Sequence, residues 1–300
     1  MNYKMMGRFI AQILLLEAIF MIPASFISLY CGEYRAVFAF LGTMALLVLI
    51  SGVLWFFCKA AKSNFYATDG MVCVALSWLI LSLAGSLPFL FSGAIPRFID
   101  ALFEIVSGFT TTGASILPAV EGLPKGILYW RSFSHWVGGM GVLVFLLAIV
   151  PSTDQGKGFT MHLLRAESPG PSVGKLVPKM RKTAAILYFL YIILTIADFC
   201  FLLLGGMPAF EALCNAFGTA GTGGFGVRND SFASYSPYLQ NVTTVFMFLF
   251  GVNFSCYYLL MLRQWGAVFK DEELRAYFGI ALCSALLITW NVRGLYGSWG

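Results

Sequence analysis

Long apolar runs alternate with short charged breaks along the whole chain. An uncharged apolar run of about 18 to 20 residues can cross the hydrocarbon core of a bilayer as an α-helix. By this criterion the pattern predicts seven spans, at residues 7–29, 36–58, 71–92, 126–151, 181–204, 240–262 and 276–292. The first run is too long for a typical signal peptide and a second span follows it directly, so we interpret it as a span. The chain is therefore predicted to be an all-α integral membrane protein.

Composition supports this class and excludes others. Hydrophobic residues make up 59% of the chain and charged residues only 11%, about half the charged fraction of a soluble domain. The seven cysteines are scattered, without a C-x-x-C motif or a Cys/His cluster, so neither a zinc site nor a disulfide framework is indicated. No cluster of titratable or metal-binding residues indicates an enzyme, and no organic cofactor is expected.

The distribution of basic residues predicts the orientation. Thirteen Lys and Arg residues lie at the N-terminus and in the breaks after the second, fourth and sixth spans, whereas five lie in or beside the opposite breaks. Such a bias places the N-terminus in the cytoplasm. The formal net charge of +5 is thus a topology signal, and no nucleic-acid partner is expected. The basic stretch 157–182 is interpreted as an interfacial segment that contacts anionic membrane lipids or a regulatory partner.

Two segments on the predicted external side, 93–125 and 205–239, are too apolar for simple solvated loops, and they resemble each other. Each contains a Gly-x-x-Pro sequence, an apolar stretch and a run of Thr and Gly. The runs are TTTGAS (110–115), here named the first Thr/Gly segment, and GTAGTGGFG (218–226), the second Thr/Gly segment. With the flanking spans they form an internal repeat of about 110 residues.

The apolar stretch before each Thr/Gly segment is predicted to be a short helix. Pro96 and Pro208 lie where a helix can start without a backbone donor. Asp100 and Glu211 fall near the first turn, where negative charge suits the helix N-terminus. About a dozen residues are too few to cross a bilayer, so re-entrant half-helices are expected.

The Thr/Gly segments have the chemistry of a monovalent-cation site. Gly113, Gly223 and Gly224 are expected to adopt φ > 0, so that successive carbonyls point the same way. Such carbonyls can replace the hydration shell of a weakly held monovalent cation, and the C-terminal end of each half-helix directs its negative pole to the same ion. Segment threonines are expected to bond neighbouring backbone groups: Thr111, Thr112 and Thr222. No anionic side chains are present to favour a divalent ion.

These considerations give a candidate site. The residues predicted to hold the cation are Thr111, Thr112, Gly113, Gly221, Thr222 and Gly223. The residues predicted to support them are Thr110, Ala114, Ala220, Gly224, Arg131 and Glu104. Residues 221–226 also match G-x-G-x-x-G, but a helical pattern precedes them and no βαβ unit surrounds them, so a dinucleotide site is not indicated.

Other polar residues in apolar surroundings have less specific interpretations. Arg131 could pair with Glu104 or with Glu121. Glu17 and Asp198 lie within spans, where we favour a helix-packing or interfacial role. The glycines that follow in the fourth span permit close helix approach beside the short helix: Gly138, Gly139 and Gly141. His135 and His162 are single and unpaired, so neither indicates catalysis or a metal site.

Several phrases resemble the membrane subunit of Trk-type potassium uptake systems, in the Trk/Ktr/HKT superfamily. They are LAGSLPFLFSG (83–93), SGFTTTGAS (107–115), YWRSFSHWVGGMGVLVF (129–145), RAESPGP (165–171), GTGGFG (221–226) and GVNFSCYY (251–258). The resemblance covers the whole chain.

The resemblance implies four repeats of span, pore helix, filter and span around one central pore, preceded by an extra pair of spans. By that plan 1–66 is the N-terminal pair, 67–155 the first repeat, 156–174 a cytoplasmic connection, 175–265 the second repeat and 266–300 the start of a third, truncated repeat. The chain is then expected to be C-terminally incomplete and to supply half of a filter.

The resemblance also implies a function, which is potassium uptake across a bacterial inner membrane by a homodimer with a cytosolic nucleotide-binding regulatory subunit. In this family a serine in place of the first filter glycine goes with sodium preference, so glycine at both Gly113 and Gly223 favours potassium. Sodium or mixed monovalent-cation permeation, or a non-conducting fragment, are the alternatives. A membrane enzyme is not favoured.

Overall fold

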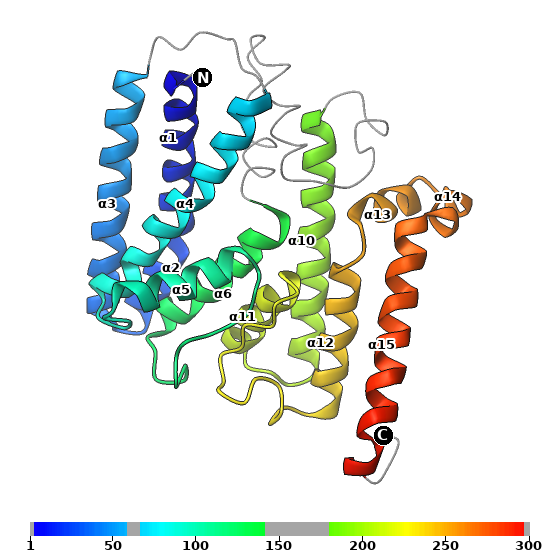
Figure 1. Ribbon diagram of the computed structural model, residues 1–300. Helices are drawn as coiled ribbons and strands as arrows, with labels where there is room; N and C mark the ends of the chain where they lie inside the picture. The colour runs from blue at the N-terminus through cyan, green and yellow to red at the C-terminus, as the bar shows by residue number, and fades with distance from the viewer. Residues whose placement is uncertain (1–2, 59–66, 142–179, 297–300) are drawn as a thin grey trace. The chain divides into compact units, whose positions relative to one another are not determined.

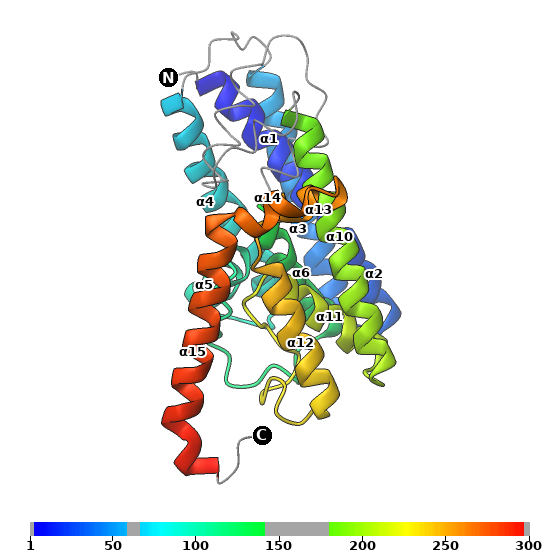
Figure 2. The same cartoon turned by 90° about the vertical axis from the view of Figure 1, so that its right-hand side faces the viewer.

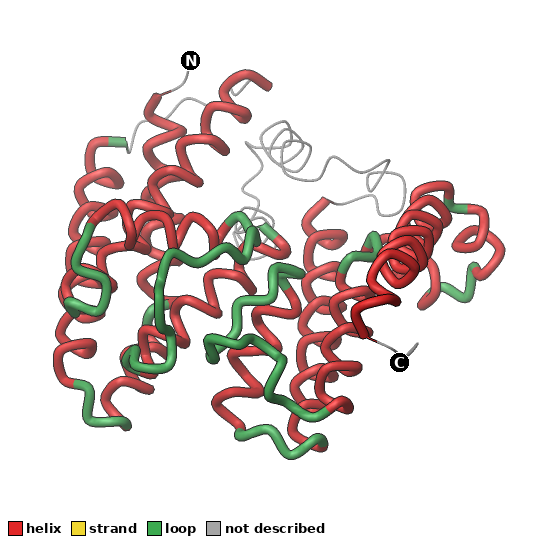
Figure 3. Tube along the Cα trace, turned by 60° about the horizontal axis from the view of Figure 1, so that its bottom comes forward, coloured by secondary structure: helices red, strands yellow, loops and turns green. Residues whose placement is uncertain are grey.

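The computed structural model describes residues 3–58, 67–141 and 180–296. Within these ranges it contains helices and loops and no strand, as the tube in Figure 3 shows. The chain divides into two compact units, Met1–Phe250 and Gly251–Gly300, which are described separately. The prediction of an all-helical protein is confirmed for the described residues.

The helices follow one another in the order labelled in Figure 1. Those of the first unit are α1 (Tyr3–Phe20), α2 (Ile22–Tyr30), α3 (Tyr34–Phe57), α4 (Ala67–Phe91), α5 (Phe98–Phe109), α6 (Lys125–Met140), α10 (Met180–Leu204), α11 (Ala209–Ala220) and α12 (Pro237–Phe250). Those of the second unit are α13 (Phe254–Met261), α14 (Trp265–Lys270) and α15 (Glu272–Tyr296).

Among the described residues, five helices are long and apolar enough to cross a membrane. They are Tyr3–Tyr30, Tyr34–Phe57, Asp69–Phe91, Ala185–Leu204 and Glu272–Arg293. All five agree with predicted spans. The first is formed by α1 and α2 together, which meet at Met21, and Pro23 lies at the start of α2. Proline fits there because the first turn of a helix needs no donor from it.

The predicted span 240–262 falls on two helices that together are long and apolar enough to cross a membrane, with a break between them that the sequence pattern did not predict. Helix α12 ends at Phe250 and α13 begins at Phe254. The side chain of Asn253 accepts a hydrogen bond from the backbone N–H of Ser255, which is the usual N-cap interaction that starts a new helix. For the predicted span 126–151, α6 covers the first part and ends at Met140, whereas residues 142–151 lie outside the described ranges.

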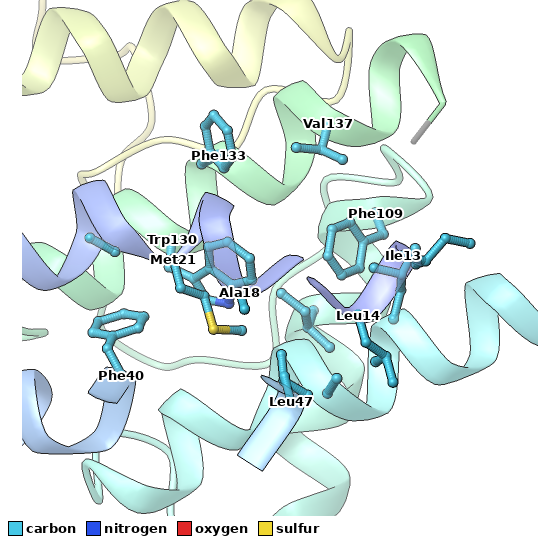
Figure 4. Close-up of a cluster of buried hydrophobic side chains, with 14 of the residues drawn as sticks. Ile13, Leu14, Ala18, Met21, Phe40, Leu47, Phe109, Trp130, Phe133 and Val137 are labelled. Carbon is cyan, nitrogen blue, oxygen red and sulfur yellow. The ribbon is translucent and has the colours of Figure 1, made fainter. Parts of the chain in front are cut away.

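A large apolar core joins the N-terminal helices to the first short helix. Helix α1 packs against α3 and α4, and α5 packs against α4 and α6. The close-up in Figure 4 shows the centre of this core, which contains Met21, Phe109 and Trp130. Trp130 is fully buried, and its indole N–H donates to the carbonyl of Gly85 over 2.9 Å. The N-terminal helices α1 and α3 thus support α5 through α4, against which all three pack.

A second cluster surrounds the second short helix. It contains Leu202 of α10, Ala212 and Ala216 of α11, and Leu239 of α12. Helix α11 therefore packs against α10 and α12, and on another side it packs against α6. Figures 1 and 2 show α6 close to both α5 and α11 in the middle of the unit. Helix α6 is thus the element shared by the two short helices.

The second unit is smaller and has its own core. Val252, Cys256 and Val268 are its buried residues, and Tyr257 and Leu274 pack against them. The long helix α15 carries exposed apolar side chains along its length, as a lipid-facing helix does.

Candidate functional site

Two short helices of equal length lead into the two Thr/Gly segments. Helices α5 and α11 have 12 residues each, and Ala209 starts α11 111 positions after Phe98 starts α5. Asp100 and Glu211 lie in their first turns, as predicted. The long helices that precede them, α4 and α10, have 25 residues each. The two stretches therefore share both the lengths and the order of their helices.

The backbone after each short helix makes the same turn. Thr111 and Thr222 have φ of 54° and 55°, and Gly113 and Gly224 have φ of 75° and 74°, again 111 residues apart. The N–H of Thr111 donates to the carbonyl of Gly108, and the N–H of Thr222 donates in the same way to that of Thr219. Positive φ is uncommon for a β-branched residue and is maintained only when the surroundings impose it. Both segments thus leave their helices through one repeated, strained geometry.

The expectation of positive φ is confirmed for Gly113 and Gly224 but is wrong for Gly223, which is absent from the left-handed region. Gly223 is required for space instead. A Cβ atom on Gly223 would lie 2.6 Å from the carbonyl oxygen of Thr111 and would collide with Nε2 of His135. Real Cβ atoms essentially never come within 3.0 Å of another heavy atom.

The two Thr/Gly segments touch each other. A Cβ atom on Gly113 would collide with the carbonyl oxygen of Gly223 and would lie 3.1 Å from its Cα atom. Thr112 and Thr222 are exposed and Thr111 is half-buried. The structure therefore brings Thr111 and Gly113 of the first segment against Gly223 of the second.

Hydroxyl groups hold the first segment, but not through the expected donors. Ser107, which sequence reasoning missed, donates from Oγ to the carbonyl of Ala114 over 2.6 Å. Thr110 donates to the backbone of its own helix and shares a 2.7 Å hydrogen bond with the hydroxyl of Thr112. The hydroxyl of Thr222 makes no hydrogen bond within the described residues. Ser107 therefore has the role that the threonines were predicted to have.

A buried ion pair fixes the exit of the first segment. Glu104 of α5 accepts from Nε of Arg131 over 3.4 Å, and both side chains are almost completely buried. Its other oxygen accepts from the hydroxyl of Ser115 and from the N–H of Ile116. Of the two predicted partners for Arg131, Glu104 is the one present; Glu121 accepts from the backbone N–H of Asn229 instead.

Arg131 also reaches the second segment. Its Nη1 donates to the carbonyl of Gly226 over 3.0 Å, and its guanidinium lies 3.7 Å from the centre of the Phe225 ring. One buried cation thus joins α5, α6 and the second Thr/Gly segment. Buried charges of this kind are stable only when they are paired and hydrogen-bonded.

Close approach of backbones completes the contact between α6 and the two short helices. A Cβ atom on Gly138 would collide with the carbonyl oxygen of Phe109, the last residue of α5. A Cβ atom on Gly139 would lie 3.1 Å from the carbonyl oxygen of Ala220, the last residue of α11, and 3.1 Å from the Cα of Gly221. The prediction that these glycines permit close packing is confirmed.

His135 is the residue that sequence reasoning undervalued. It lies one helical turn after Arg131 on α6 and is completely buried. Its ring is centred 4.3 Å from the Phe225 ring. The only sequence signal was its spacing of four from Arg131, which places both side chains on one helix face. His162 lies outside the described residues.

Glu211 of α11 binds polar side chains of the loop that precedes α12. Glu211 accepts from Arg228 over 3.1 Å and from the hydroxyl of Tyr235, and the Arg228 guanidinium lies 4.3 Å from the centre of the Tyr235 ring. Partial burial, together with the neighbouring Glu211 carboxylate, raises the pKa of Tyr235 to about 12. Glu211 and Arg228 line a cavity of about 660 Å³, together with Glu33, Glu121, Lys125 and Asp230.

Comparison with known proteins gives one consistent result. The family model TrkH, described as cation transport protein, matches residues 36–292. The Trk system potassium uptake protein TrkH of Salmonella typhimurium is 34% identical over 293 residues, which cover 96% of this chain and 60% of that protein. An uncharacterized cation transporter of Methanocaldococcus jannaschii is 34% identical over 206 residues, covering 68% of this chain and 41% of that protein.

The fold agrees with a solved structure. The crystal structure of the potassium transporter TrkH from Vibrio parahaemolyticus superposes with a TM-score of 0.82 at 29% identity, over 100% of this chain and 61% of that one. The chain thus spans about three-fifths of the length of these two TrkH proteins. Because the family match covers most of its residues, the chain belongs to the TrkH family of cation transport proteins.

Proposed function

We propose that the chain forms part of a potassium uptake pore, in which α5 and α11 are pore helices and the two Thr/Gly segments are filter strands. The observation that carries the proposal is the contact of two matched non-helical segments at Gly113 and Gly223. Non-helical backbone survives at membrane depth only when it is buried in protein or lines a wet pathway. The relatives named as potassium uptake proteins support potassium as the transported ion.

Backbone carbonyls are the proposed ligands. The residues that provide them are Thr111, Thr112, Gly113, Gly221, Thr222 and Gly223. Carbonyl oxygens can replace the water shell of a weakly hydrated cation, and the C-terminal ends of α5 and α11 add the negative poles of their dipoles. The supporting residues are Thr110, Ala114, Ala220, Gly224, Arg131 and Glu104. Potassium is transported here, and no organic cofactor is required by this chemistry.

The proposed architecture assigns 67–155 and 175–265 to two pore repeats, 1–66 to a supporting pair of helices, 156–174 to a connection and 266–300 to the start of a third repeat. The equal lengths of α4 and α10 and of α5 and α11 support the two repeats. The two filter strands of this chain then supply half of a four-part filter.

The proposed setting is a bacterial inner membrane with the N-terminus in the cytoplasm. The excess of Lys and Arg at the N-terminus and in alternate breaks supports this orientation. A homodimer with a cytosolic nucleotide-binding regulatory subunit is proposed as the working assembly. The relatives' names, which refer to a Trk system, support the presence of further components.

The test is potassium uptake by the native reading frame that contains this chain, expressed in a bacterial strain without potassium uptake. We expect growth at limiting potassium and uptake of radioactive rubidium. In Gly113→Ser, the added Cβ collides with the Gly223 carbonyl and displaces a ligand. A loss of about 1.4 kcal/mol of discrimination corresponds to an about tenfold higher sodium-to-potassium flux ratio.

Gly122→Ser is the matched control, because a Cβ atom at Gly122 meets nothing within 4 Å. Its flux ratio should equal that of the wild type. Absence of growth and of flux in the wild type would show that the protein does not conduct. Equal flux ratios for Gly113→Ser and the wild type would contradict the filter assignment.

A further inference from the structure

His135 lies at the junction of the two Thr/Gly segments. Its Nε2 would collide with a Cβ atom on Gly223, and the same Cβ atom would lie 2.6 Å from the carbonyl oxygen of Thr111. The imidazole is therefore packed against the second segment at the point where that segment meets the first. It is 0% exposed, and it interacts with the backbone carbonyl of Thr111 in the first segment.

The same imidazole is packed along the second segment at two further positions. A Cβ atom on Gly221 would lie 2.5 Å from Cδ2 of His135 and 2.8 Å from its carbonyl oxygen. The Phe225 ring, which is also buried, lies against the imidazole on one side and beneath the Arg131 guanidinium. Gly221, Gly223 and Phe225 therefore all have positions that depend on the ring of His135.

This packing explains two glycines that backbone conformation does not explain. Neither Gly221 nor Gly223 has a positive φ, so another residue could adopt their backbone geometry. Only the absence of a side chain lets them approach His135. Protein interiors are close-packed, and a displaced side chain moves its neighbours. A change in the volume at position 135 should thus change the distance between the two segments.

The first segment is held to the same helix by separate contacts. Gly138, one turn after His135 and two turns after Arg131 along α6, lies against the carbonyl of Phe109, where α5 ends. Arg131 binds Glu104, whose carboxylate holds Ser115 and Ile116. Helix α6 therefore holds the first segment through these contacts, and its residue His135 packs against Gly221 and Gly223 of the second segment.

We propose that His135 is a positioning residue that determines ion selectivity by setting the separation of the two Thr/Gly segments. The proposal rests on the proposed function, because it assumes that these segments form the filter. Carbonyl ligands discriminate between potassium and sodium through their number and spacing. A side chain that packs against these ligand segments can thus determine ion specificity although it does not itself touch the ion.

The test compares sodium and rubidium fluxes for three substitutions in the native reading frame. His135→Asn is shorter and cannot reach Gly223 and Phe225, whereas His135→Leu keeps the volume but loses the planar ring. Both should raise the sodium-to-rubidium flux ratio by about three- to tenfold, the range of one lost polar contact. His135→Gln can place its amide near the position of Nε2 and should remain within about twofold of the wild type.

Val137→Ala is the control for general loosening of α6. Val137 is also buried on this helix, but it packs into the apolar core of Figure 4. It should lower the amount of folded transporter in the membrane without changing the flux ratio. If His135→Leu does not accumulate, His135→Asn and His135→Gln still decide the result.

The outcomes separate the two levels of the proposal. A wild-type protein without selective potassium flux contradicts the proposed function itself. A selective wild type, with unchanged flux ratios in His135→Asn and His135→Leu, contradicts the role of His135 alone. An equal rise of the ratio in Val137→Ala would also contradict it, because the effect would then arise from any loosening of α6.

Discussion

The regions around α5 and α11 have the same backbone and different side-chain anchors. In the first, Glu104 is buried and binds Arg131, Ser115 and Ile116. The residue 111 positions later in α11 is Asn215, which makes only weak contacts with a sulfur and a hydroxyl. The second region is instead anchored on the loop side, where Glu211 binds Arg228 and Tyr235.

The support behind the two short helices differs as well. Gly85 of α4 and Asp198 of α10 are 113 positions apart, as are the last residues of these helices. A Cβ atom on Gly85 would lie 2.9 Å from the carboxylate of Glu17. A buried carboxyl thus occupies this place in both regions, supplied by α10 itself in one and by the N-terminal helix α1 in the other.

The comparison shows which features the backbone turn after each short helix requires. The left-handed residues Thr111 and Thr222, and the glycines that follow, are common to both regions. The charged anchors are not. We infer that the backbone turn is the fixed requirement, and that an ion pair or a packed carboxyl can hold it from different sides.

The largest effect is expected when the buried ion pair of Arg131 and Glu104 is broken. Arg131→Met leaves the Glu104 carboxylate buried without its cation and should lower the free energy of unfolding by about 3–5 kcal/mol. Thermal unfolding of the purified protein in detergent measures this loss. Combining it with Glu104→Gln should recover part of the stability, because the unpaired charge is then removed.

Arg228→Met is the corresponding change in the second region. Arg228 and Glu211 are partly exposed, and an exposed pair contributes little because water screens it. Its unfolding temperature should stay close to that of the wild type. Equal losses for Arg131→Met and Arg228→Met would show that the two anchors are equivalent, contrary to the comparison.

A medium effect is expected from alanine at the matched glycines. Gly224→Ala places a side chain at positive φ, at a cost of about 1–2 kcal/mol, but its nearest neighbour is a flexible methionine methyl group 3.8 Å away. Gly113→Ala has the same backbone strain and in addition collides with the Gly223 carbonyl. Gly113→Ala should therefore be the less stable and the less selective variant. The reverse order, in unfolding and flux assays, would contradict the contact between the segments.

The smallest effect concerns Tyr235. Its pKa in the folded protein, raised from 10.0 to about 12 by burial and by Glu211, means that the folded state holds the phenolic proton more tightly than the unfolded state. This stabilisation is complete below pH 10 and is lost as the pH rises through about 12. The Tyr235→Phe variant has no phenolic proton, so its stability should not fall in this way as the pH rises. Parallel stability curves for both proteins over that range would show that the pKa of Tyr235 is not raised in the folded protein.

Local chemistry accounts for what the sequence could predict. Apolar run length identified the spans, and proline, first-turn acids and Thr/Gly runs identified both short helices and their segments. The positive φ of Gly113 and Gly224 was predictable because glycine adopts it without strain. The pair of Glu104 and Arg131 was one of two alternatives, since charges within apolar segments need partners.

Contacts between distant residues account for what the sequence could not predict. Gly223 is glycine because His135 and Thr111 approach it, and no local pattern shows such an approach. The break between α12 and α13 was misjudged because apolar residues continue through it, although Asn253 before Ser255 is a recognisable N-cap. Of the two roles predicted for Glu17 and Asp198, their burial agrees with helix packing and not with an interfacial position.

The central claim is that the two touching Thr/Gly segments form a monovalent-cation site. Crystals of the native protein grown with rubidium in place of potassium test it most directly, because the anomalous scattering of rubidium locates the ion. The account predicts an anomalous peak beside the carbonyls of residues 111–113 and 221–223. Rubidium peaks elsewhere in the protein, with none beside these carbonyls, would contradict it.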